Sequence, residues 1–135
     1  MGFLDKLRTA FTRQRTPRVN PDDPDLVVVA ASFDDAEAAS AALTRSSDLR
    51  PTDQAVLRHH LSLPADRVGE AAALIAQDGY VLREVLPFDG GPVLAYALRA
   101  QVVTALECAR ERSRMASLAT RLGGHALGWD VLQTR

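Results

Sequence analysis

The order of strand-like and helix-like segments from residue 54 onward is the feature that most constrains this fold. Apolar residues that alternate with polar ones predict strands, and apolar residues spaced three or four apart predict helices. Proline at a first helical position and glycine after the last turn mark the helix ends. These rules predict, in chain order, a strand at 56–63, a helix at 64–79, strands at 80–86 and 93–98, a helix at 102–122 and a strand at 126–132.

This order is the β-α-β-β-α-β plan of ferredoxin-like domains. A further strand at 26–31 and an Ala-rich helix at 34–46 precede it, so the domain has an extra N-terminal βα unit. Right-handed crossovers, each with one strand inserted between its two parallel strands, give the order last-first-third-second for the four later strands. The strand at 26–31 can extend the sheet edge beside the final strand. We therefore predict an α+β fold with a five-stranded antiparallel sheet, in the strand order 1-5-2-4-3, and with the helices on one face.

The sequence divides into three parts. Residues 1–15 predict a basic amphipathic helix, residues 16–25 a linker rich in proline and aspartate, and residues 26–132 a single α+β domain. The apolar stripe of the helix consists of Phe3, Leu4, Leu7 and Phe11. Three uses are open for this helix: weak contact of residues 3–11 with an anionic membrane surface, binding in a groove of another protein, or packing on its own domain.

Cysteine usage and hydropathy indicate the compartment. Cys108 is the sole cysteine, which excludes an internal disulfide and suits a reducing environment. No apolar run approaches the roughly 20 residues of a membrane span. The N-terminus also lacks the apolar stretch of a signal peptide. These features predict a small cytoplasmic protein of bacterial type.

Charge is distributed unevenly along the chain. The sequence has 16 basic and 17 acidic residues, and five of the basic ones lie in residues 1–18 together with only one acidic residue. Residues 19–135 are therefore net acidic. This disfavours direct binding of nucleic acid and suits a protein partner with a basic surface.

The groups that could support catalysis or metal binding are poorly arranged for either. His59 and His60 are neighbours on a predicted strand, so their side chains leave opposite faces and cannot share a metal. We expect His59 to be a semi-buried, hydrogen-bonded residue and His60 to lie on a polar face with Arg58. Cys108 falls on the apolar stripe of a helix, where it packs in the core. We predict no enzyme activity, no metal and no cofactor.

Two further patterns have a structural and a functional interpretation. Tyr80, Tyr96 and Trp129 could stack bases on a sheet, but no basic sheet motif accompanies them, so we expect core residues. The charged positions of the long helix are expected to lie mostly outside as a solvated face, with a partner surface as the alternative. They are Arg110, Glu111, Arg112 and Arg114.

Residues 48–132 resemble the family of regulators of ribonuclease E activity, type B. The similarity consists of a histidine on the strand five residues before a helix-opening proline, followed near the C-terminus by a Gly-Gly pair and a Gly-Trp-acid run. In this chain these are His59, Pro64, Gly123, Gly124, Gly128, Trp129 and Asp130.

The resemblance implies a non-catalytic protein that binds and inhibits the endoribonuclease of the RNA degradosome. The signature and partner-binding residues would be Arg58, His59, His60, Gly128, Trp129 and Asp130. In the predicted sheet, the strands that hold His59 and Trp129 are adjacent, so we expect these two residues to form one packed cluster. The alternatives are a small-ligand sensor of ferredoxin-like type and a membrane-surface adaptor that uses the N-terminal helix.

Overall fold

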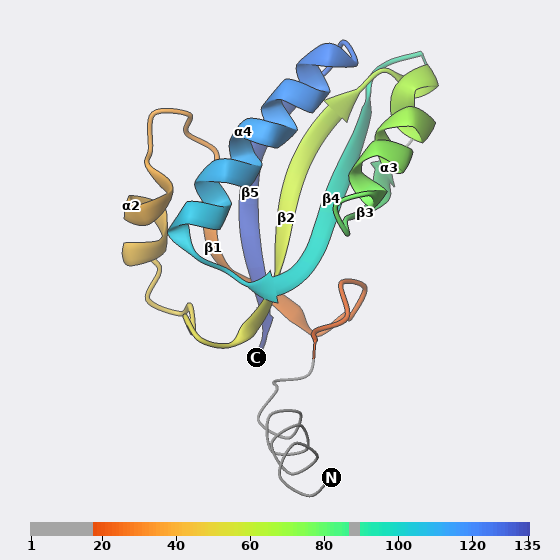
Figure 1. Ribbon diagram of the computed structural model, residues 1–135. Coiled ribbons are helices and arrows are strands. Elements are labelled where there is room, and N and C mark those ends of the chain that lie inside the picture. Colours follow the sequence, from red (N-terminus) through yellow and green to blue (C-terminus); the bar gives the residue numbers. More distant parts are fainter. Residues whose placement is uncertain (1–17, 87–89) are drawn as a thin grey trace, which may run out of the picture.

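The computed structural model describes residues 18–86 and 90–135 (Figure 1). The predicted N-terminal helix and the tip of the hairpin at 87–89 lie outside these residues. The elements are β1 (Leu26–Ser32), α2 (Ala39–Thr44), β2 (Gln54–Leu63), a 3₁₀ turn (Ala65–Arg67), α3 (Val68–Ala76), β3 (Val81–Leu86), β4 (Val93–Val102), α4 (Ala105–Arg121) and β5 (His125–Thr134).

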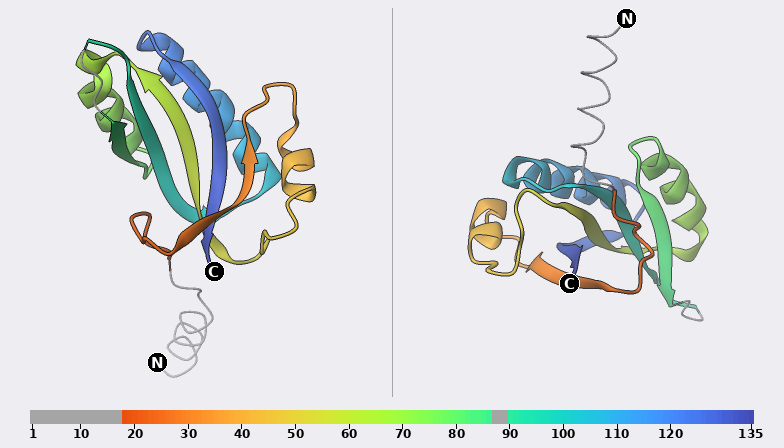
Figure 2. Two further views of the ribbon diagram at one scale, coloured as in Figure 1. Left: turned by 180° about the vertical axis from the view of Figure 1, so that it is seen from behind. Right: turned by 90° about the horizontal axis from the view of Figure 1, so that it is seen from below.

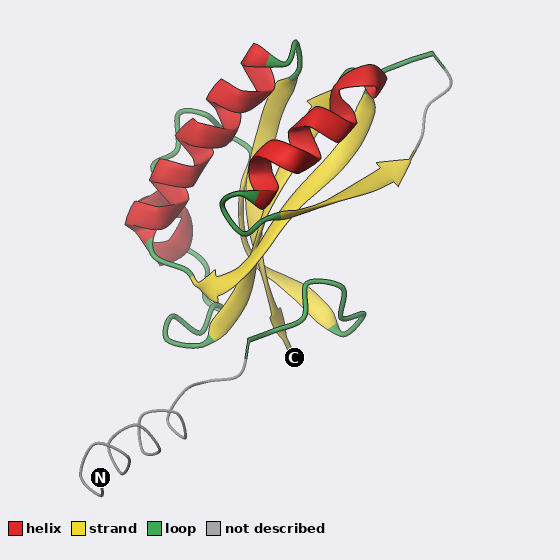
Figure 3. Ribbon diagram, turned by 45° about the vertical axis from the view of Figure 1, so that its right-hand side comes forward, coloured by secondary structure: helices red, strands yellow, loops and turns green. Residues whose placement is uncertain are grey.

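All five strands form one antiparallel sheet in the order β1-β5-β2-β4-β3, which confirms the predicted sheet order. Helices α3 and α4 cross the same side of this twisted sheet (Figure 3). Seen from behind, the sheet lies in front of these two helices (Figure 2). We call the side without helices the open face.

Several boundaries differ from those predicted. The first helix begins at Ala39 instead of residue 34, because Asp34 forms a turn in which its carboxylate accepts a hydrogen bond of 2.9 Å from the Ala36 amide. Strand β4 extends to Val102 instead of residue 98, since its ladder with β2 continues to the pair Gln54 and Val102. The helix after Pro64 starts as a 3₁₀ turn.

The core lies between the sheet and the helices. Leu61 and Leu63 of β2 pack with Ile75 of α3 and Met115 of α4 in one cluster. A second cluster joins Trp129 of β5, Leu57 of β2, Cys108 of α4 and two alanines of α2, Ala39 and Ala42. Odd-numbered residues of β2 therefore point toward the helices, as alternation along a strand requires.

The open face has a smaller apolar cluster of its own. Val56, Leu98 and Leu132 are buried there, and Val19 packs against them from the segment before β1. Asp22 of the same segment forms an ion pair of 3.0 Å with Arg83 of β3. Residues that the sequence suggests as a linker thus contact the sheet and cover one end of its open face.

A candidate partner-binding surface on the open sheet face

Strand register brings part of the predicted signature together on the open face. Arg58 lies opposite Asp130 of β5, and His60 lies opposite Gly128 of β5 and Tyr96 of β4. Even-numbered residues of β2 point away from the helices because side chains alternate along a strand. The predicted polar face with Arg58 and His60 is therefore present, at the centre of the sheet.

Arg58 and Asp130 form a two-pronged ion pair. The Nε and Nη2 atoms of Arg58 donate hydrogen bonds of 2.7 and 2.6 Å to the two carboxylate oxygens. The side chains of Arg58 and Asp130 are only 17% and 4% exposed. Burial alone would raise the pKa of Asp130, but the interactions with His60 and Arg58 outweigh it and lower the pKa. The pair is thus fixed and charged.

His60 lies between two aromatic rings. Its ring centroid is 4.9 Å from that of Phe33 and 4.7 Å from that of Tyr96, both in edge-on geometry. His60 Nε2 lies 3.1 Å from Asp130 Oδ2, within ion-pair distance, although the angle does not satisfy a hydrogen bond. The Arg58 guanidinium lies over the Tyr96 ring at 4.4 Å. Aromatic and cation–π contacts therefore join these side chains into one cluster.

Gly128 makes this arrangement possible. A Cβ atom at this position would lie 2.4 Å from Phe33 Cδ1 and 2.7 Å from the Ser32 carbonyl oxygen. Its φ of +154° is also one that other residues rarely adopt. The glycine thus leaves the space that the Phe33 ring occupies beside His60. Sequence reasoning singled out Gly128 through the resemblance and missed Phe33, because a single phenylalanine after a strand has no distinctive pattern.

Apolar side chains remain exposed around the cluster. Phe33 is 53% exposed, and Leu94, two residues from Tyr96 on β4, is 36% exposed. Val28, which is 50% exposed, lies opposite Leu132 toward the other end of the open face. Of the two acidic residues after Phe33, Asp35 forms an ion pair of 3.0 Å with Arg112 of α4. Tyr96 is partly buried and packs against the open-face cluster, so the prediction that it is a core residue is met only in part. Its strand position places it on the side that the helices leave uncovered.

His59 and Trp129 point to the other side of the sheet. They lie directly opposite each other on β2 and β5, are 2% and 0% exposed, respectively, and face the helices. Their predicted proximity in the core is confirmed. Of the six signature residues, these two are therefore buried beneath helices and have no surface for a partner.

A buried polar network surrounds His59. The Tyr80 hydroxyl donates to Glu111 Oε1 at 3.0 Å and lies 3.4 Å from His59 Nε2. Arg99 and Arg114 reach the same glutamate oxygen at 2.8 and 2.6 Å. Burial, followed by the nearby arginines, lowers the pKa of His59 to about 3. His59 is therefore neutral. It has the predicted hydrogen-bond partner, but it is fully buried instead of semi-buried.

Glu111 corrects the expectation of a solvated helix face. Its residue is 3% exposed, because three donors stabilise its carboxylate in the interior. Arg112 also turns inward, where its guanidinium donates to the backbone carbonyls of Asp34 and Glu37 at 2.8 and 3.0 Å. The charges of α4 thus anchor neighbouring segments. Helical periodicity could not show this, since it locates a charge on a helix but not its partners.

The glycine pair has a structural role, as expected. Gly123 has a φ of +82° and ends α4. A Cβ atom on Gly124 would lie 2.1 Å from the Ser62 carbonyl oxygen, so the chain passes close against β2 there. A cavity of about 590 Å³ lies at this end of the sheet, and its lining includes Ser62, Asp66 and His125.

Other candidate chemistry in residues 18–86 and 90–135 concerns metal binding, a reactive thiol and membrane insertion. There, no group of three or more His, Cys, Asp or Glu side chains is placed to hold a metal ion. Cys108 is buried, and desolvation raises the pKa of its thiol to about 12, so it is not a nucleophile. No helix in these ranges is long and apolar enough to cross a membrane.

Comparison with known proteins returns no matching family model, no matching curated protein and no matching solved structure. The resemblance to regulators of ribonuclease E is untested by these comparisons and stays a prediction.

Proposed function

We propose that this chain is a non-catalytic regulatory protein that binds another protein through the open face of its sheet. The observation that supports this most is the exposure of Phe33 and Leu94 beside the half-buried aromatic cluster of His60 and Tyr96. Exposed apolar and aromatic side chains that lie near one another are typical of interaction sites. Aromatic and arginine side chains in a partly desolvated centre provide most of the energy at such sites.

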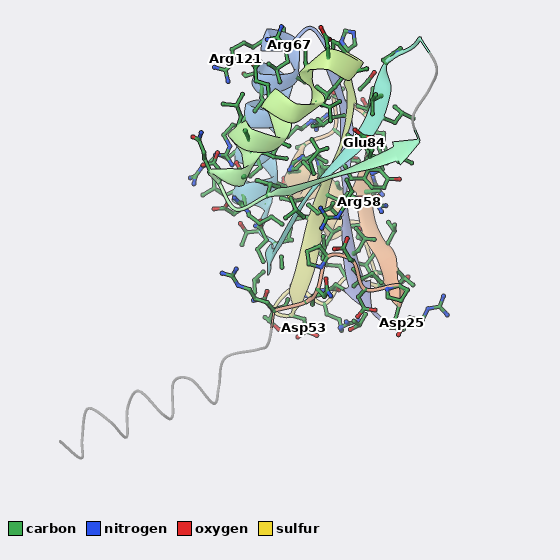
Figure 4. The ribbon with its side chains drawn as sticks, turned by 90° about the vertical axis from the view of Figure 1, so that its right-hand side faces the viewer. Asp25, Asp53, Arg58, Arg67, Glu84 and Arg121 are labelled. Atoms are coloured by element: carbon green, nitrogen blue, oxygen red, sulfur yellow. The ribbon has the colours of Figure 1, made fainter. Side chains whose placement is uncertain are left out.

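The charge around this surface favours a basic, apolar partner segment. Residues 19–135 are net acidic, while the central Arg58 and Asp130 neutralise each other. The two acidic residues after Phe33 have partners within the chain, because Asp34 binds the Ala36 amide and Asp35 pairs with Arg112 of α4. Asp25 and Asp53 lie at the end of the sheet opposite Arg67 and Arg121 (Figure 4). The net acidic charge of residues 19–135 therefore favours a basic partner segment through the overall field of the domain.

The resemblance supplies the partner class. We infer that the part from β2 to β5 is a ferredoxin-like sandwich, which its connectivity supports, and that the partner is a ribonuclease E-type endoribonuclease of the cytoplasm. Four of the six signature residues lie on the open face. Arg58, His60 and Asp130 form its centre, and Gly128 leaves the space for Phe33 beside them. Inhibition would then follow from occupation of a basic segment of the enzyme.

A cleavage assay tests this proposal. We expect the wild-type protein to slow RNA cleavage by a ribonuclease E-type enzyme, and Leu94→Asp to abolish the effect. Leu106→Asp is the matched control, because Leu106 is 65% exposed on α4, away from the open face. Equal activity of the two variants would refute the open face as the binding surface. RNA cleavage by the isolated chain would refute the non-catalytic role.

A small-ligand sensor is the second candidate function, and the cavity of about 590 Å³ favours it. Its lining brings Ser62 and His125, which lie opposite each other on β2 and β5, close to Asp66 of the 3₁₀ turn. Cavities of this size are typical of small-molecule sites. Calorimetry against a metabolite library tests it: salt-independent binding that His125→Ala removes would favour the sensor.

A further inference from the structure

The described chain begins on the open face itself. Val19 is the second described residue, and it packs against Val56, Leu98 and Leu132. Three residues later, Asp22 is held by Arg83 through two hydrogen bonds of 3.1 and 3.0 Å. The N-terminal residues 1–17 are therefore tethered to the same surface that we propose for the partner.

The geometry points to residues 3–11 as a second occupant of the open face, and we propose that this segment docks on the exposed part between Leu94 and Phe33. This inference rests on the proposed function in one respect, because both proposals use the open face as a binding surface. The segment has an apolar stripe, Phe3, Leu4, Leu7 and Phe11, that matches the exposed apolar side chains of this face. Docking would then compete with the partner.

The length of the tether permits this docking. Phe11 is eight residues before Val19, and eight extended residues span up to about 26–29 Å. On β4, Leu94 lies four residues from Leu98, where Val19 packs, or about 13 Å away. A helix over residues 3–11 would be about 12 Å long. The chain between Phe11 and Val19 is therefore long enough to bring the stripe to Leu94.

The tether also favours this occupant over others. A short covalent connection gives an effective concentration in the mM range, far above that of a second copy or a cellular partner. A single short amphipathic helix, by contrast, binds a membrane surface only marginally without a second anchor. Weak apolar contacts that would not hold a free peptide can thus hold this segment in place.

Paramagnetic labelling of the full chain tests the docking without any partner. A nitroxide is attached at Thr9→Cys, on the polar side of the stripe, while the buried Cys108 with its raised pKa stays unlabelled. We expect the NMR signals of the Leu94 methyls and the Tyr96 ring to be lost, and those of Leu106 on α4 to be retained. The same label combined with Leu7→Asp should restore the lost signals.

Three results would overturn the proposal. The first is retention of the Leu94 and Tyr96 signals in the labelled chain. The second is equal broadening of Leu106, which would show no preference for the open face. The third is broadening of an isotope-labelled chain by a separate nitroxide-labelled chain, which would identify a second copy as the occupant. Failure to bind a ribonuclease leaves all three readouts unchanged, so the two proposals fail independently.

Discussion

Removal of one member of the Arg58–Asp130 pair should destabilise the protein strongly. In Asp130→Ala, the Arg58 guanidinium keeps its place over the Tyr96 ring but loses both hydrogen bonds. An unpaired charge left in a buried position costs about 3–5 kcal/mol. Because the Arg58 side chain is 17% exposed, water relieves part of this cost, and we expect a loss of about 3 kcal/mol in the free energy of unfolding.

Urea unfolding of the single and double variants measures this effect. A double variant, Arg58→Met with Asp130→Leu, removes both charges and keeps apolar volume, so it should recover most of the lost stability. Asp130→Asn is the milder control, since it retains the shape of the side chain. A loss below about 1 kcal/mol in Asp130→Ala, the range of an exposed pair, would refute the reasoning that the pair is desolvated.

Three further predictions concern the core, the terminus and the pH dependence. Trp129→Ala should lower the free energy of unfolding by about 3–5 kcal/mol in chemical denaturation, as expected for a fully buried aromatic residue; a loss below about 1 kcal/mol would contradict its burial. Deletion of residues 1–17 should leave the thermal transition cooperative, because Val19 and its contacts remain; a collapse of the melt would show that the segment belongs to the core. The pKa of His59 falls from 6.5 to about 3 on folding, so the unfolded chain binds the proton at a higher pH than the folded chain. The free energy of unfolding should therefore decrease as the pH drops from 6.5 toward 3. Equal pH profiles of stability for the wild type and His59→Phe would contradict this prediction.

The order of the four later strands was predictable because it depends on element order, the β3–β4 hairpin and the handedness of the crossovers. The place of β1 beside β5 does not follow from these rules and was predicted only as an extension of the sheet edge. Element ends were less predictable: Asp34 has the sequence of a helix cap and forms a turn instead. Side-chain bonding decides between these outcomes, and it depends on neighbours that only the fold supplies.

The candidate site was predictable only in part. Alternation along β2 separated His59 from His60 correctly, and the register of β5 then placed Asp130 beside Arg58. The contribution of Phe33 could not be read from the sequence, because it depends on the space left by Gly128 on a neighbouring strand. The burial of Glu111 was equally hidden, since two of its three donors, Tyr80 and Arg99, come from outside α4.

Calorimetric titration of a purified basic segment of a ribonuclease E-type enzyme tests the central claim most directly. The account predicts that Phe33→Ala weakens binding by about tenfold or more, as for an aromatic anchor, while Leu106→Ala leaves it unchanged. Binding should also weaken as salt rises, because exposed charges are screened beyond about 8–10 Å at physiological ionic strength. Equal affinities of the two variants, together with salt-independent binding, would contradict the open face as the interaction surface.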